Sequence, residues 1–242
     1  MTSLLCALLV MQASPLEPLL QVGAKMDASA SEFLKGASAA AAFKAWTVKE
    51  DARQTSDLRD ALKAAGVTRL SHMGFEFSLV FVKAERSVGW LRTIVAMDRE
   101  QVGFADFRYE PLNAQARGLP LRELDGAFAE AARAVIAAIK SRNEAAIPFA
   151  DAERIATRVA CEEYASTNRW SIEQSRKRFA QTCATVAALD HDELRVRLDE
   201  VAFLAIAADG TTRGVLEANF DIAQGKYVMR LDRWRPFKKD SR

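Results

Sequence analysis

Residues 193–237 contain Arg233-Trp234-Arg235-Pro236 just before their last residue, and an earlier stretch, Arg108-Tyr109-Glu110-Pro111, resembles this motif. The two final prolines are 236 − 111 = 125 positions apart, and Gly214 follows Gly89 by the same 125 positions. Because the matches keep one order and a nearly constant offset, they predict two diverged copies of one structural unit.

Each copy is expected to contain helices followed by three strands. In the first copy Phe75, Phe77, Leu79 and Phe81 alternate with other residues, which predicts a strand with one face in a core. Further strands are expected at 89–97 and 102–109, and the second copy repeats this order after residue 193. The expected fold class is therefore α+β, with two tandem related units, each with helices followed by a three-stranded antiparallel meander.

The boundaries follow from composition and local signals. We expect a first unit at 25–112, a second unit at 120–238, and an irregular polar connection at 111–120. Helices are expected over 27–45, 121–141 and 151–165. Ser171 with Gln174 forms a capping-box pattern that predicts a helix start, and Asp209-Gly210 predicts a hairpin turn.

Composition describes an ordinary globular chain. Of 242 residues, 50% are hydrophobic and 27% charged, which argues against disorder, and 34 basic against 32 acidic residues leave a net charge of +2. Such a balance gives no reason to expect a polyanionic partner. Arg233, Trp234 and Arg235 alone could stack and bind nucleic acid, but a final strand with solvated arginines explains them better, so we expect no nucleic-acid partner.

The chain begins with an apolar stretch at 4–11, which has the length of a signal-peptide core and is too short to span a bilayer. We expect residues 1–24 to be a signal peptide, with cleavage after Ala24 or, as a poorer site, after Ala13, and no integral membrane segment. The alternative is a helix of the first unit. Export would place the protein in the periplasm or outside the cell, and otherwise it is cytoplasmic. It would also leave Cys161 and Cys183 as a candidate disulfide.

Few residues suggest catalysis. His191, between Asp190 and Asp192, is the candidate acid, base or metal ligand, yet consecutive residues at a helix-to-strand junction point in different directions. His72 is expected at a strand edge or in the core. The chain has no Gly-rich phosphate loop, nucleophile elbow, H-E-x-x-H or C-x-x-C motif, so we expect no cofactor and no metal site.

The order of helices and meander, ending in Arg-Trp, resembles the bacterial nuclear transport factor 2-like proteins of the cystatin-like α+β type, best over 121–237. The resemblance implies helices on the concave side of a curved sheet, enclosing a pocket. Catalytic members carry acidic and histidine side chains in the pocket. Here Glu162, Glu163, Asp199 and Asp221 have that chemistry, although the last two fall on polar strand faces where solvent exposure is expected.

Three functions remain open at this point. The leading hypothesis is a non-enzymatic exported bacterial protein that binds a small apolar ligand or a protein partner. The first alternative is an isomerase, dehydratase or hydrolase with a pocket in the second unit that uses His191 and a carboxylate. The second alternative is a structural or assembly protein that forms a homodimer through its sheets.

Overall fold

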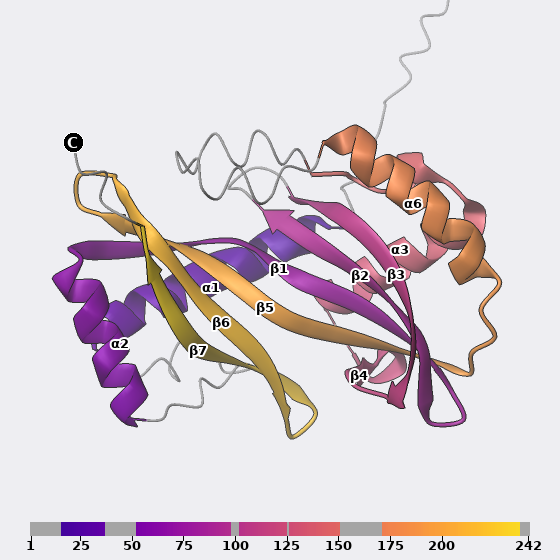
Figure 1. Ribbon diagram of the computed structural model, residues 1–242, viewed down its shortest axis with the longest axis horizontal. Coiled ribbons are helices and arrows are strands. Elements are labelled where there is room, and N and C mark those ends of the chain that lie inside the picture. Colours follow the sequence, from indigo (N-terminus) through magenta and orange to yellow (C-terminus); the bar gives the residue numbers. More distant parts are fainter. Residues whose placement is uncertain (1–15, 37–51, 98–101, 125, 151–170, 238–242) are drawn as a thin grey trace, which may run out of the picture.

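The computed structural model describes residues 16–36, 52–97, 102–124, 126–150 and 171–237 (Figure 1). In chain order its helices and strands are α1 (Glu17–Lys35), α2 (Ala52–Ala64), β1 (Val67–Lys83), β2 (Arg86–Met97), β3 (Val102–Gln115), β4 (Leu119–Pro120), α3 (Ala127–Ser141), α6 (Ile172–Ala187), β5 (Glu193–Ala207), β6 (Thr212–Ala223) and β7 (Lys226–Pro236). Short 3-10 turns follow β4 and α3. None of the described helices is long and apolar enough to cross a membrane.

The described strands form one antiparallel sheet in the order β3-β2-β1-β5-β6-β7, with β4 pairing to β5. Two meanders, β1-β2-β3 and β5-β6-β7, therefore meet where β1 pairs with β5. The pairs Phe75↔Val201 and Leu79↔Val196 belong to this central seam. The predicted α+β class is confirmed.

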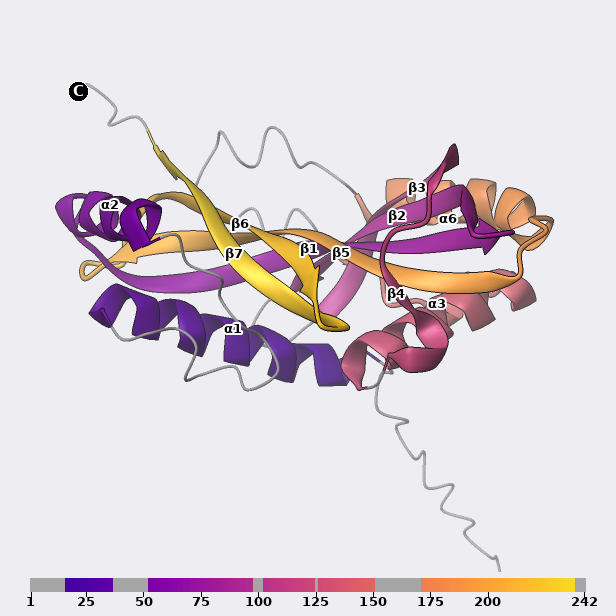
Figure 2. The same cartoon turned by 90° about the horizontal axis from the view of Figure 1, so that it is seen from below.

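Helices cover the sheet unevenly. Figure 2 shows α1 and α3 along one side of the sheet, with α2 and α6 at its two ends. Each end helix contacts the meander of the other half: α2 precedes β1 in the chain and contacts β7, whereas α6 precedes β5 and contacts β3. At the second contact Phe179 meets Phe107 edge-on at 5.1 Å between ring centroids, and Arg178 forms an ion pair with Asp106.

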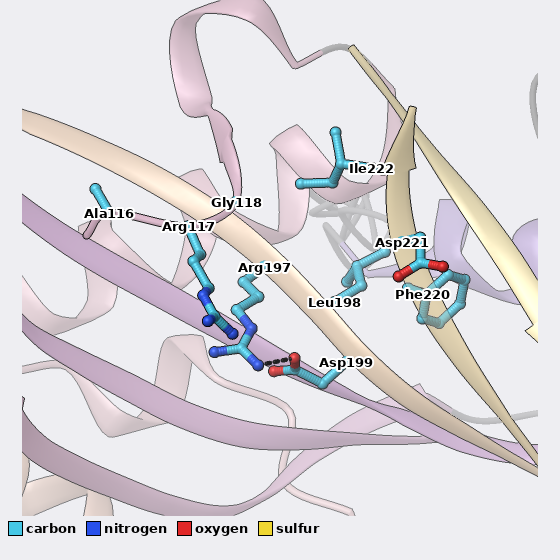
Figure 3. A pocket seen from close by; sticks show the side chains of 9 residues that line it. All are labelled: Ala116, Arg117, Gly118, Arg197, Leu198, Asp199, Phe220, Asp221 and Ile222. Carbon is cyan, nitrogen blue, oxygen red and sulfur yellow. Dashed lines mark ion pairs between the residues drawn. The ribbon is translucent and has the colours of Figure 1, made fainter. Parts of the chain in front are cut away.

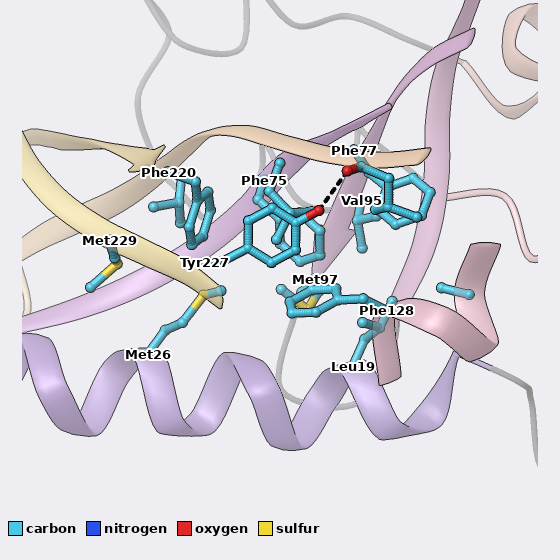
Figure 4. Close-up of a cluster of buried hydrophobic side chains, with 14 of the residues drawn as sticks. Leu19, Met26, Phe75, Phe77, Val95, Met97, Phe128, Phe220, Tyr227 and Met229 are labelled. Atoms are coloured by element: carbon cyan, nitrogen blue, oxygen red, sulfur yellow. Dashed lines mark hydrogen bonds between the residues drawn. The ribbon is translucent and has the colours of Figure 1, made fainter. Parts of the chain in front are cut away.

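The core lies between the sheet and the helices α1 and α3 (Figure 4). The alternating residues Phe75, Phe77, Leu79 and Phe81 are each at most 1% exposed, as the predicted core face requires. Ser78, Val80 and Val82 are buried as well, so this part of β1 is covered on both faces, not on one as expected. Phe128 of α3 contacts Phe75 edge-on at 5.6 Å. This face of the sheet is filled by the protein's own side chains.

Local signals have mixed outcomes. The Ser171–Gln174 capping box is present at the start of α6, and Asp209-Gly210 lies in the turn between β5 and β6, with Gly210 at φ 83°. The helix expected at 27–45 instead begins at Glu17 and ends at Lys35, followed by Gly36 at φ 83°. The helix expected at 151–165 lies outside the described residues.

The expected irregular connection at 111–120 is wrong. Strand β3 continues to Gln115, and Leu119 pairs with Val196 of β5. Pro111 lies within β3 opposite Gly89. A proline is tolerated there because β3 is an edge strand, where a missing N–H need not break a ladder.

Candidate functional site

The sheet face turned away from α1 and α3 is polar near the seam. Strand register places Arg92 of β2 and Arg197 of β5 on either side of Ser78 of β1. The Trp90 ring contacts both cations, with its centroid 5.0 Å from the guanidinium carbon of Arg92 and 4.9 Å from that of Arg197. Cation–π attraction of this kind orients both guanidinium groups. The indole N–H of Trp90 donates to Glu110 at 2.9 Å.

Two carboxyl groups, those of Glu76 on β1 and Asp199 on β5, lie across the β1–β5 seam from each other, next to these arginines. Glu76 accepts two hydrogen bonds from Arg92, at 2.9 Å from Nε and 2.8 Å from Nη2. Asp199 forms an ion pair with Arg197 through Oδ1, and its buried Oδ2 has no hydrogen-bond partner among the described residues. Burial raises the pKa of Asp199, Arg197 opposes this rise, and the nearby charge of Glu76 adds to it.

Beside this pair the sheet opens into a notch. Strand β6 pairs with β5 only as far as Asn219, opposite Glu200, whereas β4 pairs with β5 at Arg195 and Val196. The gap between β4 and β6, which we call the β4–β6 notch, has a volume of about 450 Å³. Its lining includes Ala116, Arg117, Arg197, Asp199, Phe220 and Asp221.

Two arginines face this notch from different elements. Figure 3 shows the guanidinium groups of Arg117, from the link between β3 and β4, and Arg197, from β5, next to each other. Arg197 is paired with Asp199, but Arg117 is exposed and forms no ion pair within the described part of the chain. An unneutralised guanidinium next to a second one favours an anion between them.

The wall of the notch is held by tight contacts. The buried Tyr227 of β7 donates its hydroxyl hydrogen to the carbonyl oxygen of Val196 at 2.6 Å. Burial raises the pKa of the Tyr227 hydroxyl, which keeps it a donor. Gly118 has φ 97°, and a Cβ there would lie 2.2 Å from the Val196 oxygen. Any larger residue at position 118 would therefore push the Arg117 segment away from β5.

His191 lies outside this site. Its ring contacts Phe81 edge-on at 5.2 Å, and its Nδ1 lies 2.9 Å from the carbonyl oxygen of Leu189. Within the described residues His191 forms no ion pair with a carboxylate, and it does not line the notch. The role of His191 as an acid, base or metal ligand therefore stays a prediction.

His72 is held by α1. Its Nδ1 lies 2.9 Å from Oδ1 of Asp27, which also accepts the His72 backbone N–H at 2.6 Å. The ring packs against Gly23, where a Cβ would lie 2.3 Å from Nε2. These contacts join α1 to β1, and they fit the expected structural role for His72.

The remaining candidates divide between the notch and undescribed segments. Cys183 is buried in α6, whereas Cys161, Glu162 and Glu163 lie outside the described residues, so the disulfide stays a prediction. Asp221 is exposed at the notch, as expected, but the side chain of Asp199 is only 19% exposed, so the expectation of solvent exposure is wrong for it. It is covered because Arg197 pairs with it and Glu76 lies across the seam from it.

No described group of three or more His, Cys, Asp or Glu side chains could hold a metal ion. Comparison with known proteins adds nothing to these observations: no protein family, no curated relative and no solved structure matches this chain.

Proposed function

We propose that this chain is a non-enzymatic binding protein, and that its ligand is a small molecule that presents a carboxylate or phosphate group to Arg117 and Arg197 in the β4–β6 notch. The observation that carries the proposal is Arg117, which is exposed beside Arg197 and has no acidic partner in the described chain. Guanidinium groups bind such anions through paired, charge-assisted hydrogen bonds.

A purely apolar ligand has less support. The apolar face of the sheet is occupied by side chains such as Phe75, Phe128 and Tyr227 (Figure 4), and Ile222 is the one large hydrophobic residue that is exposed among those described. Phe220 and Ile222 do line the notch next to the arginines. The ligand that fits is therefore an anion with a short apolar part.

Calorimetric titration with octanoate at neutral pH tests this proposal. We expect binding to the wild type, and a loss of about tenfold or more in Arg117→Ala, because a hydrogen bond to a charged group contributes roughly 1.5–3 kcal/mol. Arg230→Ala is the matched control, since Arg230 is also an exposed strand arginine but does not line the notch. Equal affinity in both variants, or equal binding of octanol, would refute the proposal.

An acid–base enzyme is the second candidate, favoured by the carboxyl pair. Catalytic acids and bases often form pairs whose environments separate their protonation, and Asp199 has a raised pKa beside Glu76. Under this alternative the bound anion would be a substrate. A Glu76→Gln or Asp199→Asn variant that binds the anion but no longer converts it would favour the enzyme.

We also propose that 25–112 and 120–238 are diverged copies of one unit. The first strands begin at Val67 and Glu193, and 193 − 67 = 126; the second strands begin at Arg86 and Thr212, and 212 − 86 = 126. The sheet order is symmetric about the β1–β5 seam, and the crossed contacts of α2 and α6 share that symmetry. Copies that pair this way would be intertwined, so we expect neither half to fold when expressed alone.

Export and the nuclear transport factor 2-like resemblance stay proposals. Leu19 and Met26 of α1 are fully buried, so cleavage after Ala24 would remove part of a packed helix, whereas cleavage after Ala13 would leave α1 whole. Intact mass of the protein from its native host distinguishes these sites from an uncleaved chain. Light scattering tests the homodimer.

A further inference from the structure

Within the part of the chain that the structure describes, the buried oxygen Oδ2 of Asp199 has no hydrogen-bond partner. Arg197 engages the other oxygen, Oδ1. In the β1–β5 register Glu76 falls between the pairs Phe75↔Val201 and Phe77↔Leu198, so it lies across the seam from Asp199 and Glu200. Both oxygens of Glu76 already accept hydrogen bonds from Arg92. An unpartnered buried carboxylate oxygen is costly, but a protonated one becomes a donor that its neighbour can accept.

Charged and titratable groups reach Asp199 from every neighbouring element. On its own strand these are Arg197 and Glu200, and the others are Glu76 on β1, Arg92 on β2, Arg117 before β4, Asp221 on β6 and Tyr227 on β7. The neighbouring Glu200 also has a raised pKa, caused first by burial and then by Glu217. Acidic neighbours and burial therefore oppose ionisation of Asp199, and Arg197 is the cation that contacts it directly.

We propose that Asp199 takes up a proton and donates it in a hydrogen bond to Glu76, and that this protonation frees Arg197 to bind the anionic ligand in the β4–β6 notch. This inference rests on the proposed function, and it adds regulation to the same site. When Asp199 is ionised it competes with the ligand for Arg197. When it is protonated it donates to Glu76, and two free guanidinium groups face the notch.

The consequence is that anion affinity rises as pH falls. Uptake of one proton with the ligand strengthens binding by up to about tenfold per pH unit above the pKa of Asp199. The probe must not titrate itself, so octanesulfonate is used, which stays ionised throughout. Calorimetric titrations between about pH 4.5 and 8 then report only protein groups.

Asp199→Asn is the decisive variant because it keeps the shape and cannot ionise. We expect it to bind octanesulfonate at pH 8 as tightly as the wild type does at low pH, with no pH dependence. Asp190→Asn is the control, since Asp190 pairs with Lys83 and is far more exposed; it should keep the wild-type profile. A wild-type affinity that is independent of pH, or an Asp199→Asn variant with the wild-type profile, would overturn the inference while leaving the anion site intact.

Carbon-13 NMR titration of the carboxyl groups tests the protonation of Asp199 separately from anion binding in the notch. We expect the Asp199 carboxyl to titrate above its ordinary value of 3.8, and to titrate lower in Glu76→Gln. Absence of this shift would overturn the proposed protonation of Asp199 whatever the binding result. A shifted Asp199 with no octanesulfonate binding at any pH would refute the anion site and, with it, the regulatory link.

Discussion

Next to Glu76 and Asp199 the two faces of the sheet have opposite chemistry although the same strands build them. In β1, Phe75 and Phe77 point to α1 and α3, whereas Glu76 between them points to the polar face with Arg92. The apolar face is closed by aromatic contacts, and the polar face keeps an open notch lined by Arg117, which forms no ion pair with any residue that the structure describes. A strand's period of two therefore places the residues that stabilise the fold and those that face the notch on opposite sides of the same strands.

Phe77→Ala should have the largest effect on this division. Phe77 is fully buried and contacts Phe104 at 6.0 Å between ring centroids, so its loss leaves a cavity and costs about 3–5 kcal/mol of unfolding free energy. Urea denaturation measures the cost, with the exposed Ile222→Ala as control. A cost below about 1 kcal/mol would mean that Phe77 does not lie in the core between the sheet and the helices α1 and α3.

Gly118→Ala should have an intermediate effect that reaches the polar face. It adds a Cβ close to the Val196 oxygen at a positive φ, which costs roughly 1–3 kcal/mol and displaces Arg117. Gly210→Ala is a matched control, because Gly210 has φ 83° but no atom within 4 Å of the added Cβ. We expect only the first variant to weaken octanoate binding. Equal effects of both would show that the Gly118 contact does not shape the notch.

Asp199→Asn should change stability least, and in a pH-dependent way. Because the folded-state pKa of Asp199 is raised, the folded protein binds more protons than the unfolded chain between 3.8 and the raised value. The stability of the wild type therefore falls as pH rises through this window, and the variant lacks that fall. Chemical denaturation at about pH 4 and pH 7 should show the variant gaining relative to the wild type at the higher pH. A constant difference would contradict the raised pKa.

The apolar face could be predicted from sequence, and the polar site could not. Alternation of Phe75, Phe77, Leu79 and Phe81 is a local signal, and so are the Ser171–Gln174 capping box and the Asp209-Gly210 turn. Glu76 and Asp199 are 199 − 76 = 123 positions apart, and only the β1–β5 register brings them together. No sequence pattern points to Arg117 as a binding residue, since its segment has the composition of a polar connection.

The most direct test of the anion site is to observe the arginines themselves. Nitrogen-15 NMR resolves the Nε–H groups of arginine side chains, and octanoate can be added to the wild-type protein at neutral pH. We expect the resonances of Arg117 and Arg197 to shift together and saturably, while Arg230 stays unchanged. If Arg117 does not respond at saturating octanoate, or if the shifts map to arginines outside the notch, the β4–β6 notch is not an anion site.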